Sequence, residues 1–172
     1  GLDDDLTQGM AYAQFCAGGT ALATNLATYV NHASRVMDRL MSWGVGLELA
    51  IGLPDAFYPH GPGSCSDGRR MIQATPIQRS AMGEWTDALR PAHYCPPGVS
   101  WGDVARWGGF ANRRNWDAQE LARREAEGWL AAGQGLVAQL LVAYLKHGGH
   151  LALNMGATEL VFSEQRVCGV RT

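Results

Sequence analysis

The sequence predicts an α+β protein built from several helices and a few short strands. Two stretches, 20–43 and 136–147, repeat apolar residues at steps of three and four, as one face of a helix does. Between them, 52–68 is crowded with glycine and proline and should form a structured loop. The end of the chain, 150–170, holds short runs typical of strands. Hydrophobic residues make up 47% of the 172 positions and charged residues 17%, which favours a buried core over disorder.

The N-terminal part predicts two helices. The stretch 6–16 follows the acidic residues Asp3 to Asp5, which suit a helix start, and precedes Gly18-Gly19, which suits a helix end. The longer helix should run from Thr20, as N-cap, to Trp43, with Gly44 just beyond its end. A turn into a short strand follows over 44–49. Four apolar residues of the longer helix are expected to be buried against the rest of the chain: Leu22, Leu26, Val30 and Leu40.

The middle of the chain predicts less regular structure. The loop 52–68 carries the aromatic residues Phe57 and Tyr58 beside His60. We expect a strand and an exit turn over 69–79, and irregular structure over 91–116. The large apolar area of the tryptophans in that second stretch should pack them over neighbouring elements.

The C-terminal part predicts a charged, exposed helix over 117–130 and an apolar helix over 136–147 that ends at Gly148-Gly149. Three β-like runs follow, at 150–154, 158–163 and 166–170. Met155-Gly156 and Glu164-Gln165 join these runs into a hairpin-like ladder.

The bulk properties exclude several classes of partner. A formal net charge of −2, with Arg and Lys scattered, argues against nucleic acid and acidic lipid. No apolar run approaches the ~20 residues of a transmembrane helix, and the acidic start is unlike a signal peptide. The histidines have no metal-site spacing, so no metal is expected. We expect a soluble, cytoplasmic protein whose cysteines are free thiols: Cys16, Cys65, Cys95 and Cys168.

The stretch from Gly133 to Ala138 formally fits the pattern G-x-G-x-x-A. A dinucleotide-binding fingerprint needs a strand immediately before it, so that a tight turn delivers the pyrophosphate to a helix N-terminus. Here the preceding 127–130 is expected to be helical. We therefore interpret Gly133 and Gly135 as a tight connection into the apolar helix.

Tyr58 is the strongest single candidate for chemistry. Prolines and glycines surround it, and they fix a side chain at a loop tip. A phenol can polarise a carbonyl by donating a hydrogen bond, or act as an acid or base if its pKa is lowered. From the residues alone, packing remains the favoured role over catalysis.

Five stretches together resemble one family, in the same order and over nearly the whole chain. The loop Tyr58-Pro59-x-Gly61-Pro62-Gly63 is similar to the family pattern Y-P-E-x-P-G-G, and the stretch 166–170 is similar to R-V-x-G-V. The other similar stretches are 29–45, 76–91 and 133–149. The pattern T-x-L-V at 158–161 is also similar and belongs to the same stretch as 166–170. The family is the FAD-dependent 3-ketosteroid dehydrogenases with the related fumarate reductase flavoproteins.

The resemblance implies an FAD-binding domain interrupted by a substrate-capping domain. Residues 1–130 would be part of the cap, and 131–172 a helix and strands of the FAD-binding part. The activity implied is hydride transfer next to a carbonyl of a flat hydrophobic ketone, a 3-ketosteroid, with FAD as cofactor. The residues implied are Tyr58 as the catalytic group, Phe57, His60 and Arg69 at the substrate, and Gly133, Gly135 and Thr158 at the cofactor.

The sequence departs from the family in ways that leave alternatives open. The N-terminal G-x-G-x-x-G unit and the C-terminal FAD segment would lie outside these residues, so tight FAD binding is expected of the complete enzyme and not of this chain alone. His60 stands where the family commonly has an acid, and Phe57 where it often has a tyrosine. The alternatives are a non-catalytic ligand-binding cap, a relative of structural value, and a fumarate reductase-like enzyme for a small dicarboxylate. A fragment, a truncated product and one half of a split enzyme completed by a second chain all agree with the sequence.

Overall fold

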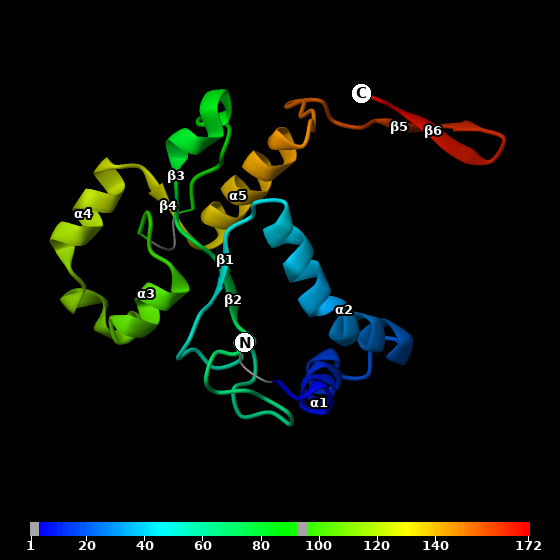
Figure 1. Ribbon diagram of the computed structural model, residues 1–172. Coiled ribbons are helices and arrows are strands. Elements are labelled where there is room, and N and C mark those ends of the chain that lie inside the picture. The colour runs from blue at the N-terminus through cyan, green and yellow to red at the C-terminus, as the bar shows by residue number, and fades with distance from the viewer. Residues whose placement is uncertain (1–3, 93–95) are drawn as a thin grey trace.

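The computed structural model describes residues 4–92 and 96–172, and it confirms the α+β class (Figure 1). Helices alternate with short strands that pair antiparallel as β1 with β2, β3 with β4 and β5 with β6. The elements in chain order are α1 (Leu6–Ala17), α2 (Ala23–Ser42), β1 (Leu47–Leu49), β2 (Ile72–Ala74), β3 (Ile77–Gln78), the 3-10 helix η1 (Arg79–Trp85), α3 (Trp101–Arg106), the 3-10 helix η2 (Phe110–Asn115), α4 (Ala118–Ala126), β4 (Trp129–Leu130), α5 (Ala132–Lys146), β5 (Glu159–Ser163) and β6 (Arg166–Arg171).

The ribbon of β1 and β2 lies between two groups of helices (Figure 1). On one side α1 packs against α2, and on the other side α3 and α4 form the second group. Helix α5 packs against β2 and η1. Gln139 of α5 fixes this packing, because its Oε1 accepts from the backbone N–H of Gly46 at 3.1 Å and its Nε2 donates to the carbonyl of Thr75 at 3.1 Å.

Helix α1 has the predicted ends. The carboxylate of Asp5 accepts a hydrogen bond from the backbone N–H of Thr7 at 2.8 Å, and Gly18 ends the helix with a φ of 55°. Asp3 and Cys95 lie outside the described residues, and the structure describes the other cysteines as free thiols. The expectation that Thr20 caps α2 was wrong. Its hydroxyl donates to the carbonyl of Ala17 at the end of α1, and α2 begins after Leu22 without a side-chain cap.

The apolar stripe of α2 is less buried than expected. Leu26, Val30 and Leu40 are half-buried, but Leu22 is 69% exposed. Leu22 lies before the first residue of α2, in the short connection that follows α1. Gly44, with a φ of 90°, follows the end of α2 as predicted.

Three further expectations were wrong. The stretch 91–116 contains α3 and η2, and a capping box in which Ser100 and Asp103 bond to each other's backbone N–H starts α3. Helix α4 ends at Ala126, after which Gly128 turns the chain into β4, and α5 begins at Ala132. The run 150–154 forms no strand, whereas β5 and β6 form the predicted hairpin.

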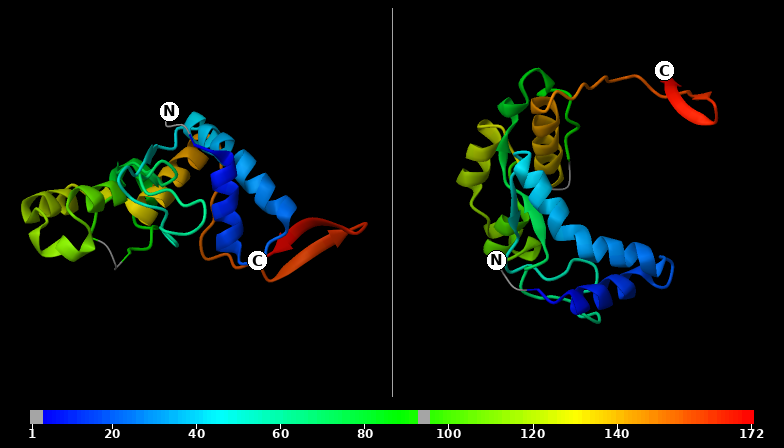
Figure 2. Two further views of the ribbon diagram at one scale, coloured as in Figure 1. Left: turned by 90° about the horizontal axis from the view of Figure 1, so that it is seen from below. Right: turned by 45° about the vertical axis from the view of Figure 1, so that its right-hand side comes forward.

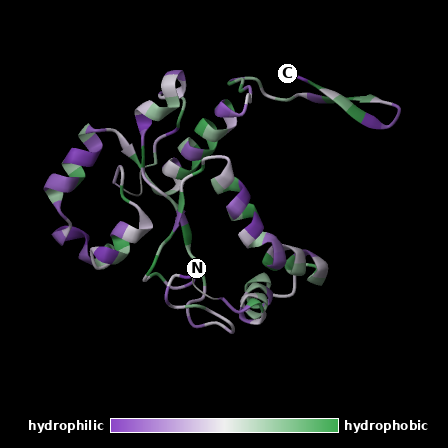
Figure 3. Ribbon diagram, viewed as in Figure 1, coloured by the Kyte–Doolittle hydropathy of each residue, from purple (hydrophilic) through white to green (hydrophobic). Residues whose placement is uncertain are grey.

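The described residues have two small apolar cores. One lies between η1, β4 and α5, and the other encloses the tryptophans of 91–116, which pack as predicted. The buried residues are Met82, Leu130 and Ala138 in the first core, and Val99, Val104 and Trp116 in the second. Helix α4 is mostly hydrophilic, as its charged sequence predicted (Figure 3).

The C-terminal hairpin stands apart from the other described elements. From Leu151 to Thr172 every residue is exposed except Gly169, which is half-buried. The hairpin projects from the rest at the end of an extended segment (Figure 2). The chain exposes 11798 Å² in total, whereas a compact monomer of 18.5 kDa exposes about 8,200 Å². About 3,600 Å² more surface is therefore accessible than a compact protein of this mass would leave.

Two observations concern the described ranges, 4–92 and 96–172. No helix there combines the length and apolarity needed to cross a membrane. Nor do His, Cys, Asp or Glu side chains gather there in a group of three that would hold a metal ion.

Candidate functional site

The loop that carries Tyr58 is closed by hydrogen bonds around Asp55. The Asp55 N–H donates to the carbonyl of Cys65 at 2.8 Å, and the Cys65 N–H donates to the Asp55 carboxylate at 2.7 Å. Arg70 holds the interior of the loop, because its Nη1 donates to the carbonyl of Gly63 at 2.6 Å and lies 3.6 Å from the Asp55 carboxylate. These contacts give a loop without regular secondary structure a defined shape.

Helix α1 lies along this loop. At its start, Arg70 forms an ion pair with Asp4 at 2.8 Å. Further along, Gly63 approaches so closely that a Cβ there would lie 2.2 Å from the carbonyl oxygen of Gln8. A Cβ on Gly61 would similarly lie 2.7 Å from the ring of Phe15. The two glycines of the predicted loop motif are thus required for contact with α1.

Tyr58 lies at the tip of the loop against the end of α1. Its backbone N–H donates to the hydroxyl of Tyr12 at 3.3 Å, and its ring meets the Phe15 ring edge-on with centroids 5.2 Å apart. Tyr58 is 52% exposed, so the residue is accessible from solvent. Burial raises the pKa of Tyr12, and the neighbouring Cys16 raises it further, so the Tyr12 phenol is protonated at neutral pH.

Three of the predicted site residues line one pocket of about 330 Å³. Phe57, Tyr58 and His60 come from the loop, and Phe15 comes from α1. Pro59 and Gly61 complete the lining. The sequence did not identify Phe15 as a site residue, because only the folded loop brings it beside Tyr58, and its own helix offers no local signal for that contact.

Arg69, the fourth residue expected at the substrate, does not line this pocket. Its Nε donates to the carboxylate of Asp67 at 2.9 Å. These hydrogen bonds hold the pKa of Asp67 well below its ordinary value. Arg69 therefore pairs with an exposed carboxylate of its own loop in this structure, and its substrate role stays a prediction.

The residues expected at the cofactor do not converge. Gly133 and Gly135 lie in the first turn of α5, where Gly135 approaches the backbone of Leu130. Thr158 lies next to the hairpin and its hydroxyl donates to the carbonyl of Arg171 at 3.1 Å. The expectation of a helix over 127–130 was wrong, since β4 precedes α5. However, β4 pairs antiparallel with β3, unlike the parallel βαβ unit of a dinucleotide site. The described residues do not by themselves assemble a cradle for FAD.

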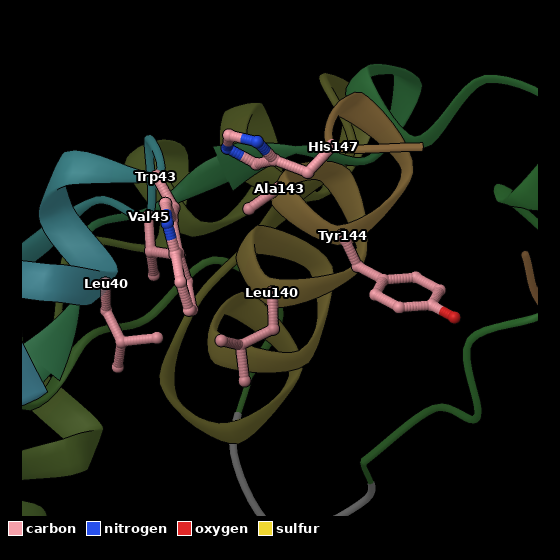
Figure 4. Close-up of a pocket in the computed structure, with 7 residues that line it drawn as sticks. All are labelled: Leu40, Trp43, Val45, Leu140, Ala143, Tyr144 and His147. Atoms are coloured by element: carbon pink, nitrogen blue, oxygen red, sulfur yellow. The ribbon is translucent and has the colours of Figure 1, made fainter. Parts of the chain in front are cut away.

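A second, larger pocket of about 480 Å³ lies between the end of α2 and α5 (Figure 4). Trp43 and His147 face one another with ring centroids 6.2 Å apart, and the Arg39 guanidinium lies 5.3 Å from the Trp43 ring. The Tyr144 ring points away from Trp43, and its hydroxyl donates to the carbonyl of His150. None of the residues predicted for catalysis, substrate or cofactor lines this pocket. The others that do are Leu40, Val45, Leu140 and Ala143.

Comparisons with known proteins place this geometry in context. No family model matches the sequence. The chain is 27% identical over 178 residues to 4-oxocyclohexanecarboxylate 2-dehydrogenase of Sinomonas cyclohexanicum, an alignment that covers 99% of this chain and 30% of that protein. The structure of this chain is similar to that of 3-ketosteroid Δ1-dehydrogenase of Sterolibacterium denitrificans in complex with 1,4-androstadiene-3,17-dione.

That structural match has a TM-score of 0.74 at 19% sequence identity, and it covers 98% of this chain and 34% of the other. The chain therefore spans about a third of the length of each of these relatives. The resemblance read from the sequence is confirmed: this chain has the fold of one portion of a 3-ketosteroid dehydrogenase.

Proposed function

We propose that this chain is part of a flavin-dependent dehydrogenase that acts next to the carbonyl of a flat, hydrophobic ring ketone of the 3-ketosteroid kind. Residues 1–130 would form the substrate-capping portion, and 131–172 a helix and hairpin of the FAD-binding portion. The observation that carries the proposal is the pocket in which Phe57, Tyr58 and His60 meet.

The substrate class is supported by the names of the relatives. Both are dehydrogenases of ring ketones, one of 4-oxocyclohexanecarboxylate and one of 3-ketosteroids. A flat apolar ring suits the aromatic lining that Phe15, Phe57 and Tyr58 give the pocket. A small dicarboxylate, the alternative, carries two carboxylates, and the described lining of this pocket contains no arginine or lysine that would pair with both.

Tyr58 has the chemistry that dehydrogenation next to a carbonyl requires. Dehydrogenation removes two hydrogens: the carbon next to the carbonyl loses a proton to a base, and the following carbon would give its hydride to the flavin as the double bond forms. Negative charge builds on the carbonyl oxygen as the proton leaves. A phenol that donates a hydrogen bond to this oxygen stabilises the transition state more than the substrate. The loop holds Tyr58 at the pocket and leaves the residue 52% exposed, so that a ligand can approach it.

The hydride acceptor in this proposal, FAD, is held by polypeptide beyond these residues. Two observations support this division. Gly133, Gly135 and Thr158 do not converge on one site, and the chain exposes far more surface than a compact protein of its mass. Further segments or a second chain would cover that surface. We expect the 172-residue chain alone to bind no stoichiometric flavin, and an equimolar flavin absorbance after purification would overturn this part of the proposal.

The experiment that tests the proposal is Tyr58→Phe in the flavin-loaded enzyme, assayed with ring ketones and with small dicarboxylates. Loss of one such hydrogen-bond donor typically lowers kcat by about 10²–10³. We expect a loss of at least about tenfold with an unchanged Tm. The matched control is Tyr29→Phe, which removes a hydroxyl from a residue that is 70% exposed on α2. Normal turnover of Tyr58→Phe together with a lower Tm would assign Tyr58 a packing role and refute the proposal.

A further inference from the structure

The backbone of Tyr58 is held at both of its polar groups. Its carbonyl accepts from the N–H of Gly61 at 2.9 Å, which makes the turn at the tip of the loop. Its N–H donates to the hydroxyl of Tyr12 at 3.3 Å. The first bond lies within the loop, whereas the second reaches a helix 46 residues away in sequence.

Tyr12 is itself well placed to hold the loop. It lies in the middle of α1, half-buried, with the Gly63 backbone packed against that same turn of the helix. The ion pair of Arg70 with Asp4 anchors the N-terminal end of α1 to the loop, and the Phe15 ring contacts Tyr58 at the other end. The helix and the loop are therefore in contact along the length of α1.

We propose that Tyr12 is a positioning residue, which fixes the main chain at residue 58 so that the Tyr58 phenol stays in the pocket. This inference rests on the proposed function of Tyr58. The Tyr12 hydroxyl acts through the backbone of its neighbour and is assigned no contact with substrate. Because a phenylalanine keeps the ring and its packing, Tyr12→Phe removes only the hydroxyl that accepts this hydrogen bond and that also neighbours Cys16.

The direct test is amide hydrogen exchange at Tyr58, measured by NMR on the 172-residue chain. A hydrogen bond of ordinary net strength predicts that exchange in Tyr12→Phe is about two- to tenfold faster at Tyr58, with exchange in α5 unchanged. The control Tyr29→Phe should leave exchange at Tyr58 as it is. Unchanged exchange at Tyr58 in Tyr12→Phe would refute the inference, whatever the enzyme's activity.

The functional test is a double-mutant cycle in the flavin-loaded enzyme. Tyr12→Phe should lower kcat several-fold and leave KM within about twofold. In the Tyr58→Phe background the same change should have no further effect on kcat, because Tyr12 acts only through Tyr58. An equal, additive loss in both backgrounds would overturn the positioning role. If Tyr58→Phe alone is fully active, the proposed function fails, while the exchange result still decides whether Tyr12 holds the loop.

Discussion

The close approach of Gly63 to α1 gives the sharpest prediction about stability. Gly63 has a φ of 71°, and a Cβ there would lie 2.2 Å from the carbonyl oxygen of Gln8 and 2.8 Å from the backbone nitrogen of Tyr12. Gly52, in the same loop, has a φ of 87°, but a Cβ there would point into open space, with no described atom beyond its chain neighbours within 4 Å. Alanine at either glycine suffers the same backbone strain, but only alanine at Gly63 collides with the helix.

The magnitudes follow from these two terms. An L-residue in the left-handed region costs about 1–2 kcal/mol, which is our expectation for Gly52→Ala. Gly63→Ala adds an overlap with helix backbone that side-chain rotation cannot relieve. Overpacking typically costs about 1–3 kcal/mol, so the total for Gly63→Ala should be about 2–5 kcal/mol.

Urea unfolding followed by circular dichroism would measure both variants. The informative quantity is the difference in unfolding free energy between them, because the backbone strain cancels. We also expect Gly63→Ala, and not Gly52→Ala, to shift the NMR signals of Tyr58, since the loop must move away from α1. Equal losses of stability in the two variants would show that the loop does not pack on α1 and would refute the reasoning.

Three further predictions concern the rest of the chain. Leu26→Ala should lower the unfolding free energy by about 1–2 kcal/mol, less than for a fully buried leucine because the residue is half-buried. Leu22→Ala should change it by no more than about 0.5 kcal/mol, and chemical unfolding that shows the larger loss for Leu22→Ala would contradict this prediction. Asp103 is 2% exposed and accepts hydrogen bonds from Arg124 and Ser100. Asp103→Ala should therefore lower the unfolding free energy by about 3–5 kcal/mol. The control Asp87→Ala, at an exposed ion pair, should lower it by at most about 1 kcal/mol. Burial acts to raise the pKa of Asp103, but the hydrogen bonds from Arg124 and Ser100 outweigh it and hold that pKa below its ordinary value. The stability that this carboxylate contributes should therefore be complete at neutral pH and be lost as the pH falls below about 4; a Tm that is as acid-sensitive in Asp103→Asn as in the parent would contradict this assignment.

The sequence by itself determined the features that depend on neighbouring residues. The ends of α1 at Asp5 and Gly18 were predicted because capping is a contact between residues two to four positions apart. The hairpin of β5 and β6 was predicted for the same reason, since Glu164-Gln165 makes the turn that joins the strands. The loop motif around Tyr58 also drew attention to the right segment, because prolines and glycines restrict or permit backbone conformations locally.

Only the tertiary structure decided the features that depend on distant residues. Trp129–Leu130 is a strand because β3, about fifty residues earlier, pairs with it, although the sequence continues smoothly from a helix. Leu22 is 69% exposed at the start of α2, although its place in the apolar stripe of that helix predicted burial, because burial depends on what packs against the stripe. The neighbours of Tyr58 could not be predicted from the sequence, because they are distant from it along the chain. Tyr12 and Phe15 reach Tyr58 only because Gly61 and Gly63 let the loop close onto α1, and an approach between segments some fifty residues apart leaves no periodic pattern in either one.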